Sequence, residues 1–126
     1  MVVAALCAWH EDHRRADAAL AAVAALPAHA ALEAYSVLTR LPGGLAVPAQ
    51  DAAAVLSGRF PDAPLALEQR SRRALLSRLA EAGIRGGASY DALVGLEARQ
   101  HGRALLTLDE RAVTTYDALG IDHRPP

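Results

Sequence analysis

The stretch Ala104-Leu105-Leu106-Thr107-Leu108-Asp109 carries the strongest fold signal in the sequence. Its first five residues are almost all apolar, which predicts a strand over Ala104–Leu108 with Asp109 at its carboxyl end. A helix is expected to follow over Glu110–Leu119, and a last short strand over Ile121–Arg124. Strand, helix and strand in this order predict a βαβ unit with parallel strands.

The rest of the chain continues this alternation. Two further short strands are predicted, over Val2–Leu6 and Pro64–Leu67. The expected fold class is therefore α/β, a single domain over residues 1–126 with a largely parallel sheet covered by helices, and the site should lie at the carboxyl ends of the strands. The remaining helices are expected over His10–Ala25, Ala30–Leu41, Ala49–Ser57, Ser71–Ala82 and Ser89–Gln100, the last with Ser89 as its N-cap.

Two details of these helices bear on packing. Leu75, Leu76 and Leu79 form one apolar stripe, so we expect them to be buried. Gly95 lies inside a predicted helix, where glycine costs about 1 kcal/mol relative to alanine. A close contact between the helix and the sheet is the usual reason for such a glycine, and we expect one here.

Composition limits what the protein can be. The chain has 126 residues, enough for one core, and 52% of them are hydrophobic, which excludes a disordered chain. A net charge of −1 excludes nucleic-acid binding through bulk charge, and only 4% aromatic residues disfavour stacked aromatic platforms for RNA. The single cysteine, Cys7, excludes a disulfide framework and is expected to be buried and inert. Without a signal peptide or a membrane-spanning run, we expect a cytoplasmic protein with no membrane partner.

Three acids are the candidate site residues. Asp109 follows the Ala104–Leu108 strand, Asp91 lies in the first turn of a helix, and Glu33 lies near the start of another. Each has an ordinary structural interpretation: Asp109 as an N-cap, Asp91 as a complement to the helix dipole, Glu33 as a solvated helix residue. A cluster of all three would need a hard cation such as Mg²⁺ or Mn²⁺ to offset its self-repulsion.

The segments around these acids resemble those of a known family. The order and spacing of the segments agree with PIN-domain ribonucleases, in particular the VapC-type toxins of bacterial toxin–antitoxin pairs. The resemblance extends over nearly the whole chain. The segments that resemble the family's second, third and fourth acidic motifs are Ala28-His29-Ala30-Ala31-Leu32-Glu33-Ala34-Tyr35-Ser36-Val37-Leu38-Thr39-Arg40-Leu41, Gly86-Gly87-Ala88-Ser89-Tyr90-Asp91-Ala92-Leu93 and Leu105-Leu106-Thr107-Leu108-Asp109-Glu110-Arg111.

The resemblance implies a fold and an activity. The implied fold is a three-layer sandwich with a central, mostly parallel sheet flanked by helices. Glu33, Asp91 and Asp109 would be the catalytic acids and would hold one or two Mg²⁺ or Mn²⁺ ions for hydrolytic cleavage of RNA. The hydroxyls of Ser89 and Thr107 match positions that support the acids, through hydrogen bonds to a carboxylate or to metal-bound water. The implied partners are an RNA substrate, a second copy in a homodimer, and a VapB-type antitoxin that docks over the active-site groove.

The sequence departs from the family pattern in one place. The family's first acid ends the first, central strand, and would fall just before Val2–Leu6, so that acid and most of that strand are missing from the pattern. Either the recorded start is too late, or the chain is truncated and has a gapped sheet. The second reading favours a catalytically degenerate PIN domain that serves only as a binding module for the antitoxin and the dimer.

Two other groups were considered as sites. His10 and His13 have helical metal-ligand spacing, but no third ligand is fixed nearby, so a metal site there is disfavoured and Trp9 is expected to cover the core edge or to contact a protein. The arginines near the Ser71–Ala82 helix form either a solvated face or, with Arg40 and Arg85, a surface for RNA phosphates. They are Arg70, Arg72, Arg73 and Arg78.

Overall fold

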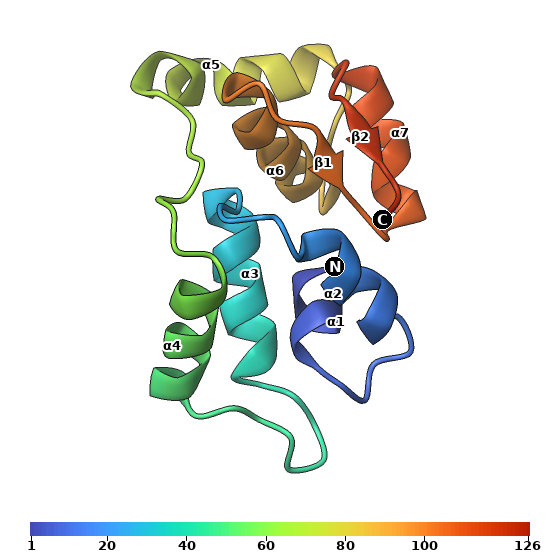
Figure 1. Ribbon diagram of the computed structural model, residues 1–126. Coiled ribbons are helices and arrows are strands. Elements are labelled where there is room, and N and C mark those ends of the chain that lie inside the picture. Colours follow the sequence, from blue (N-terminus) through green and yellow to red (C-terminus); the bar gives the residue numbers. More distant parts are fainter. The chain divides into compact units, whose positions relative to one another are not determined.

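The computed structural model describes all residues from 1 to 126 and comprises two compact units, Met1–Pro64 and Leu65–Pro126 (Figure 1). The chain is mostly helical, with seven helices and one sheet of two parallel strands. None of the helices combines the length and the apolar character that a membrane-spanning helix requires.

The first unit contains four helices. Pro27 and Pro48 directly precede α3 and α4 with φ near −52°, where proline's fixed φ and missing N–H suit a helix start. The connector after α3 is tied back to it, because the Val47 N–H donates to the Leu38 carbonyl at 2.9 Å. Cys7, Leu38 and Ala52 are the buried centre of this unit. The four helices are α1 (Val2–Leu6), α2 (His13–Leu20), α3 (Ala28–Leu38) and α4 (Ala49–Arg59).

The strand predicted over Val2–Leu6 is wrong, because this segment is the helix α1. A short apolar run does not distinguish a strand from a buried helix by periodicity, and the valines at its start outweighed the helix-favouring residues after them. α1 packs against α2 with Ala4 and Ala5 buried. The Nδ1 of His13 donates a hydrogen bond to the Ala4 carbonyl at 3.0 Å. This contact ties the first residue of α2 to α1.

The second unit is built around α6. Leu105 of β1 pairs with His123 of β2, and Leu106 with Arg124, in parallel register, so the predicted parallel pairing is confirmed. The helix between the strands completes the predicted βαβ unit. The elements are α5 (Gln69–Glu81), α6 (Ala88–Gln100), β1 (Leu105–Leu106), α7 (Glu110–Ala118) and β2 (His123–Arg124).

Two predictions for the second unit are wrong. Pro64–Leu67 forms no strand. Its backbone is bonded by side chains instead, because the Ala66 carbonyl accepts from Gln100 Nε2 at 3.4 Å and from the His101 ring at 3.0 Å. Leu76 of α5 is 77% exposed, and of the predicted apolar stripe only Leu79 is buried. The sheet therefore has fewer strands, and α5 is less buried, than the sequence pattern indicated.

Gly95 lies at the tightest contact of α6. A β-carbon at this position would lie 2.5 Å from Cδ1 of Ile121 and 3.1 Å from Cδ1 of Tyr116, both buried side chains. Real β-carbons do not approach carbon atoms as closely as the first of these distances. A close contact is present, but it is made with α7 and the segment that leads into β2 rather than with a strand of the sheet, as had been predicted.

We therefore expect Gly95→Ala to destabilise the protein. The cost of overpacking, about 1–3 kcal/mol, exceeds or matches the gain of about 1 kcal/mol in helix propensity, so the free energy of unfolding should fall by up to about 2 kcal/mol in chemical denaturation. Gly58→Ala is the matched control, because Gly58 also lies inside a helix but its β-carbon would meet nothing within 4 Å. That variant should gain up to about 1 kcal/mol. Equal stabilisation by both substitutions would contradict the packing argument.

Candidate functional site

Asp109 lies at the junction between β1 and α7. It is the N-cap of α7, and its Oδ1 accepts a hydrogen bond from the Arg111 backbone N–H at 3.0 Å. The Asp109 N–H in turn donates to Oγ1 of Thr107 at 3.0 Å. Asp109 is therefore both a structural cap and an acid held at the carboxyl end of a parallel strand. Thr107 contacts its backbone, where the sequence interpretation placed a bond to the carboxylate or to metal-bound water.

The Arg111 guanidinium covers the Asp109 carboxylate. Nε lies 3.2 Å from Oδ1, and Nη2 donates to Oδ2 at 3.4 Å. The Arg111 side chain is 93% exposed and that of Asp109 is 46% exposed, so this ion pair faces solvent. The hydrogen bond from Arg111 is the main reason that the pKa of Asp109 lies below its ordinary value.

Asp91 acts on the same guanidinium. The pKa of Arg111 is raised chiefly by its hydrogen bond to Asp109, with a further electrostatic contribution from Asp91. Asp91 lies in the first turn of α6, and α6 packs against both β1 and α7. Asp91 therefore contributes to the electrostatics of the guanidinium that pairs with Asp109, and its convergence with Asp109 stays a prediction.

The start of α6 differs from the prediction. Its N-cap is Gly87, so the assignment of this role to Ser89 is wrong. Ser89 lies inside the first turn, and its hydroxyl donates to the Gly86 carbonyl at 2.7 Å. That bond fixes the turn in which Ser89 lies, two residues before Asp91. A contact between the Ser89 hydroxyl and an acid stays a prediction.

Glu33 lies in the other unit, on α3. Its Oε1 is 3.7 Å from Nε2 of His29, one helical turn earlier, and the carboxylate is 57% exposed. This is the i, i+4 pairing that neighbouring helical side chains make. The convergence of Glu33 with Asp91 and Asp109 stays a prediction.

The donor chemistry of this site suits a hard divalent cation. Asp91 and Asp109 offer carboxylate oxygens, and both interact electrostatically with Arg111, Asp109 by direct hydrogen bonds. Magnesium is commonly held by one or two carboxylates together with substrate phosphates, so two acids are a fitting partial set. The structure assembles no group of three His, Cys, Asp or Glu side chains that could hold a metal ion.

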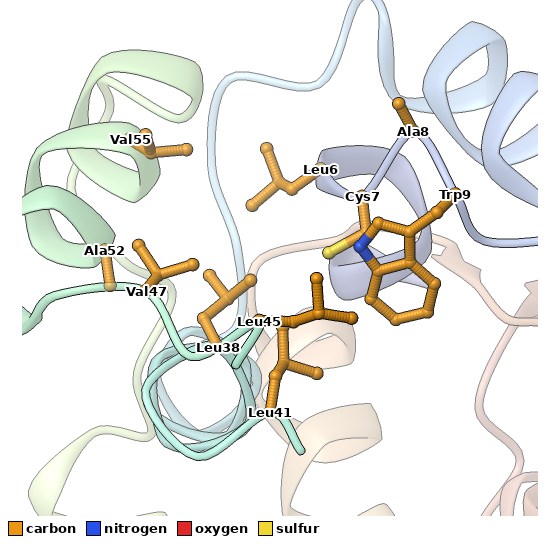
Figure 2. A pocket seen from close by; sticks show the side chains of 10 residues that line it. All are labelled: Leu6, Cys7, Ala8, Trp9, Leu38, Leu41, Leu45, Val47, Ala52 and Val55. Atoms are coloured by element: carbon orange, nitrogen blue, oxygen red, sulfur yellow. The ribbon is translucent and has the colours of Figure 1, made fainter. Parts of the chain in front are cut away.

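The sequence interpretation missed two features. Arg111 belongs to the motif segment around Asp109, but it was given no role. The second feature is an apolar groove in the first unit, with a volume of about 220 Å³ (Figure 2). Its members are scattered along the sequence, so no local pattern revealed it. The groove is lined by Leu6, Cys7, Ala8, Trp9, Leu38, Leu41, Leu45, Val47, Ala52 and Val55.

The sequence predicts the environment of two residues that line this groove, Cys7 and Trp9. Cys7 is buried as predicted, and burial raises the pKa of its thiol, as expected of an inert cysteine. Trp9 is 57% exposed, so most of its ring surface faces solvent at the groove, in accord with an edge or contact position.

Comparison with known proteins identifies the family. The PIN domain profile matches residues 1–118, and the chain belongs to the PIN-domain family, as the resemblance indicated. It is 45% identical over 122 residues to ribonuclease VapC40 of Mycobacterium tuberculosis, covering 97% of this chain and 91% of that protein. It is 47% identical over 118 residues to ribonuclease VapC27 of the same organism, covering 94% and 79%. The protein is thus a homologue of VapC ribonucleases. No solved structure matches it.

We expect Arg111→Gln to raise the pKa of Asp109 toward the ordinary aspartate value, because the variant loses the hydrogen bonds and the charge that favour the carboxylate. A carboxyl with a lowered folded-state pKa stabilises the fold above its unfolded-state pKa, and this contribution is lost as the pH falls through the folded-state pKa. The part of the free energy of unfolding that Asp109 contributes, and that is lost as the pH falls, should therefore be smaller in the variant than in the unaltered protein. NMR titration of the carboxyl carbon measures the shift directly.

Arg103→Gln is the control for this titration, because Arg103 is also exposed but precedes β1, at the opposite end of the strand from Asp109. It should leave the pKa of Asp109 unchanged. An unchanged pKa in Arg111→Gln as well would show that the ion pair is not maintained in solution.

Proposed function

We propose that this protein is a Mg²⁺-dependent endoribonuclease toxin that acts in the cytoplasm and is neutralised by a cognate antitoxin. The observation that carries the proposal is the Asp109 carboxylate, fixed at the carboxyl end of β1 and paired with Arg111, whose charge also interacts with Asp91. Homology to two ribonucleases over almost the whole chain supports the reaction class. In this proposal residues 1–126 act as one PIN domain, and β1 and β2 belong to a mostly parallel sheet between helical layers.

The proposed site consists of three acids and two supporting hydroxyls. Asp109 and Asp91, joined by Glu33, would hold Mg²⁺ or Mn²⁺. Thr107 fixes the backbone of Asp109, and Ser89 fixes the turn before Asp91. When bound, such an ion supplies charge neutralisation at the scissile phosphate and lowers the pKa of an attacking water. The chain's own task is to hold the carboxylates ionised and pointing to one place, which the low pKa of Asp109 favours.

We expect Asp91→Asn, Asp109→Asn and Glu33→Gln each to lower the rate of RNA cleavage by at least about a hundredfold, since even residues that merely support metal ligands contribute about 10–100-fold. Cleavage of a labelled RNA by purified protein with Mg²⁺ measures this, and EDTA should abolish it. Asp122→Asn is the matched control, because Asp122 is exposed and precedes β2, at the opposite end of the strand pair from Asp109.

The outcomes of this assay separate the two functions considered. Full activity in the acid variants would contradict the assignment of the site. If the unaltered protein cuts no RNA with either metal but binds the antitoxin, the catalytically degenerate binding module is the better description. Activity that Asp91→Asn alone retains would remove that residue from the proposed set.

The proposed protein partners are a second copy of the chain and a VapB-type antitoxin. The apolar groove of the first unit supports the antitoxin proposal, because Trp9, Leu45 and Val55 remain exposed there beside buried residues. An exposed apolar concavity of this kind is typical of a surface that a partner covers. We propose that apolar side chains of the antitoxin occupy it.

Val55→Asp should therefore weaken antitoxin binding by at least about tenfold, because a desolvated charge in an apolar contact costs more than 1.4 kcal/mol. Titration calorimetry with the purified antitoxin measures the change. Leu76→Asp is the control, since Leu76 is an exposed apolar residue on α5 in the other unit. Equal affinity of the Val55 variant and the unaltered protein would place the antitoxin elsewhere.

A further inference from the structure

We infer that Arg111 is a phosphate-binding residue for the substrate: its guanidinium occupies the Asp109 carboxylate until a divalent cation takes that carboxylate, and then binds a phosphate of the RNA. This inference rests on the proposed function. It goes beyond that function by assigning a role to a residue that is not one of the acids.

The first step of the argument is that the cation and Arg111 compete for the same atoms. Nε of Arg111 contacts Oδ1 of Asp109, and Nη2 contacts Oδ2, so both carboxylate oxygens are engaged. Asp91 adds its negative charge to the same guanidinium. A divalent ion bound by Asp91 and Asp109 therefore meets Arg111 where its own ligands lie. An ion that coordinates these oxygens directly competes with the guanidinium for them, both for lone pairs and through repulsion between the two positive charges.

The second step is that the release of Arg111 costs little. The Arg111 side chain is 93% exposed, and exposed ion pairs contribute little to stability because water and salt screen them. The helix does not depend on the side-chain contact, because the Arg111 backbone N–H donates to Asp109 Oδ1 independently of the guanidinium. The side chain can leave the carboxylate while α7 keeps its N-cap.

The third step concerns where the released guanidinium goes. It is anchored two residues after Asp109, so it stays beside the acids. The planar fork that matches two carboxylate oxygens also matches two phosphate oxygens, which is the reason that arginine recognises both groups. An RNA backbone drawn to the bound cation brings phosphates to this place. Arg111 is then the residue positioned to bind them.

A purely structural role for Arg111 makes a different prediction. If the guanidinium only holds Asp109 in place, its removal disorders the carboxylate and weakens the binding of both metal and RNA. If Arg111 exchanges between carboxylate and phosphate, its removal frees the carboxylate and deletes a phosphate contact. The two effects then have opposite signs, with tighter metal binding and weaker RNA binding.

The test uses Arg111→Gln and the full chain. The affinity for Mn²⁺ without RNA, measured by electron paramagnetic resonance, should rise by up to about fivefold, which corresponds to the loss of one competing exposed ion pair. Binding of a short single-stranded RNA at saturating Mn²⁺ is measured by fluorescence anisotropy at several salt concentrations, with a gel to verify that the RNA is intact. The slope of log K against log salt should be shallower by about 0.7, the contribution of one phosphate contact to single strands.

Two variants control for charge and for folding. Arg103→Gln removes the same charge from the other end of β1 and should change neither the Mn²⁺ affinity nor the salt slope. Arg111→Lys retains a positive charge, so it should restore the slope of the unaltered protein while binding RNA more weakly, because an ammonium lacks the planar fork. Restoration by lysine shows that the loss in Arg111→Gln is not a folding defect.

The results distinguish this inference from the proposed function. Weaker binding of both Mn²⁺ and RNA in Arg111→Gln, or an unchanged salt slope, overturns the role of Arg111 even if the unaltered protein cuts RNA. If the unaltered protein cuts no RNA while Arg111→Gln shows the predicted changes in both measurements, the proposed function fails and the role of Arg111 as a phosphate-binding residue is supported.

Discussion

The hydrogen bonds at the carboxyl end of β1 are the constraint on which the site depends. The Thr107 hydroxyl accepts from the Asp109 N–H, and the Asp109 carboxylate accepts from the Arg111 N–H, so three alternate residues are fixed as the chain turns from strand to helix. The bonds that hold the strand to its neighbour include those from Leu105 N–H to the Asp122 carbonyl and from Thr107 N–H to the Arg124 carbonyl. This arrangement makes the N-cap of α7 and the candidate catalytic acid the same carboxylate.

Close packing of α6 places the second acid. Gly95 lets α6 lie against Ile121 and Tyr116, a contact that any β-carbon would require the Ile121 side chain to leave, and Asp91 is one turn earlier on the same helix. The position of the Asp91 carboxylate is thus determined by a glycine that takes no part in chemistry. A substitution at Gly95 acts on the site through the helix rather than through any polar contact.

The sequence predicted this second unit better than the first, for physical reasons. The segment Ala104–Leu108 combines an apolar run with a helix start, and the parallel pairing of β1 with β2 follows from that order. The apolar run Val2–Leu6 fits a strand and a buried helix equally well. In the structure it is the helix α1, which packs on α2. Pro64–Leu67 forms only an isolated bridge at Leu65, and its Ala66 carbonyl is bonded by Gln100 and His101, which are distant in sequence. Such side-chain bonds leave no local pattern.

The site itself was predicted as a set of acids, and this explains what was missed. The positions of Asp91 and Asp109 follow from the sequence pattern of acids, but that pattern does not identify the positive group that offsets their charge. Arg111 pairs with Asp109, and its charge also interacts favourably with that of Asp91. This ion pair faces solvent, so it favours the ionised Asp109 carboxylate without burying either charge. The proposed metal ion would then supply charge neutralisation at the phosphate rather than the folding free energy that a structural metal site supplies.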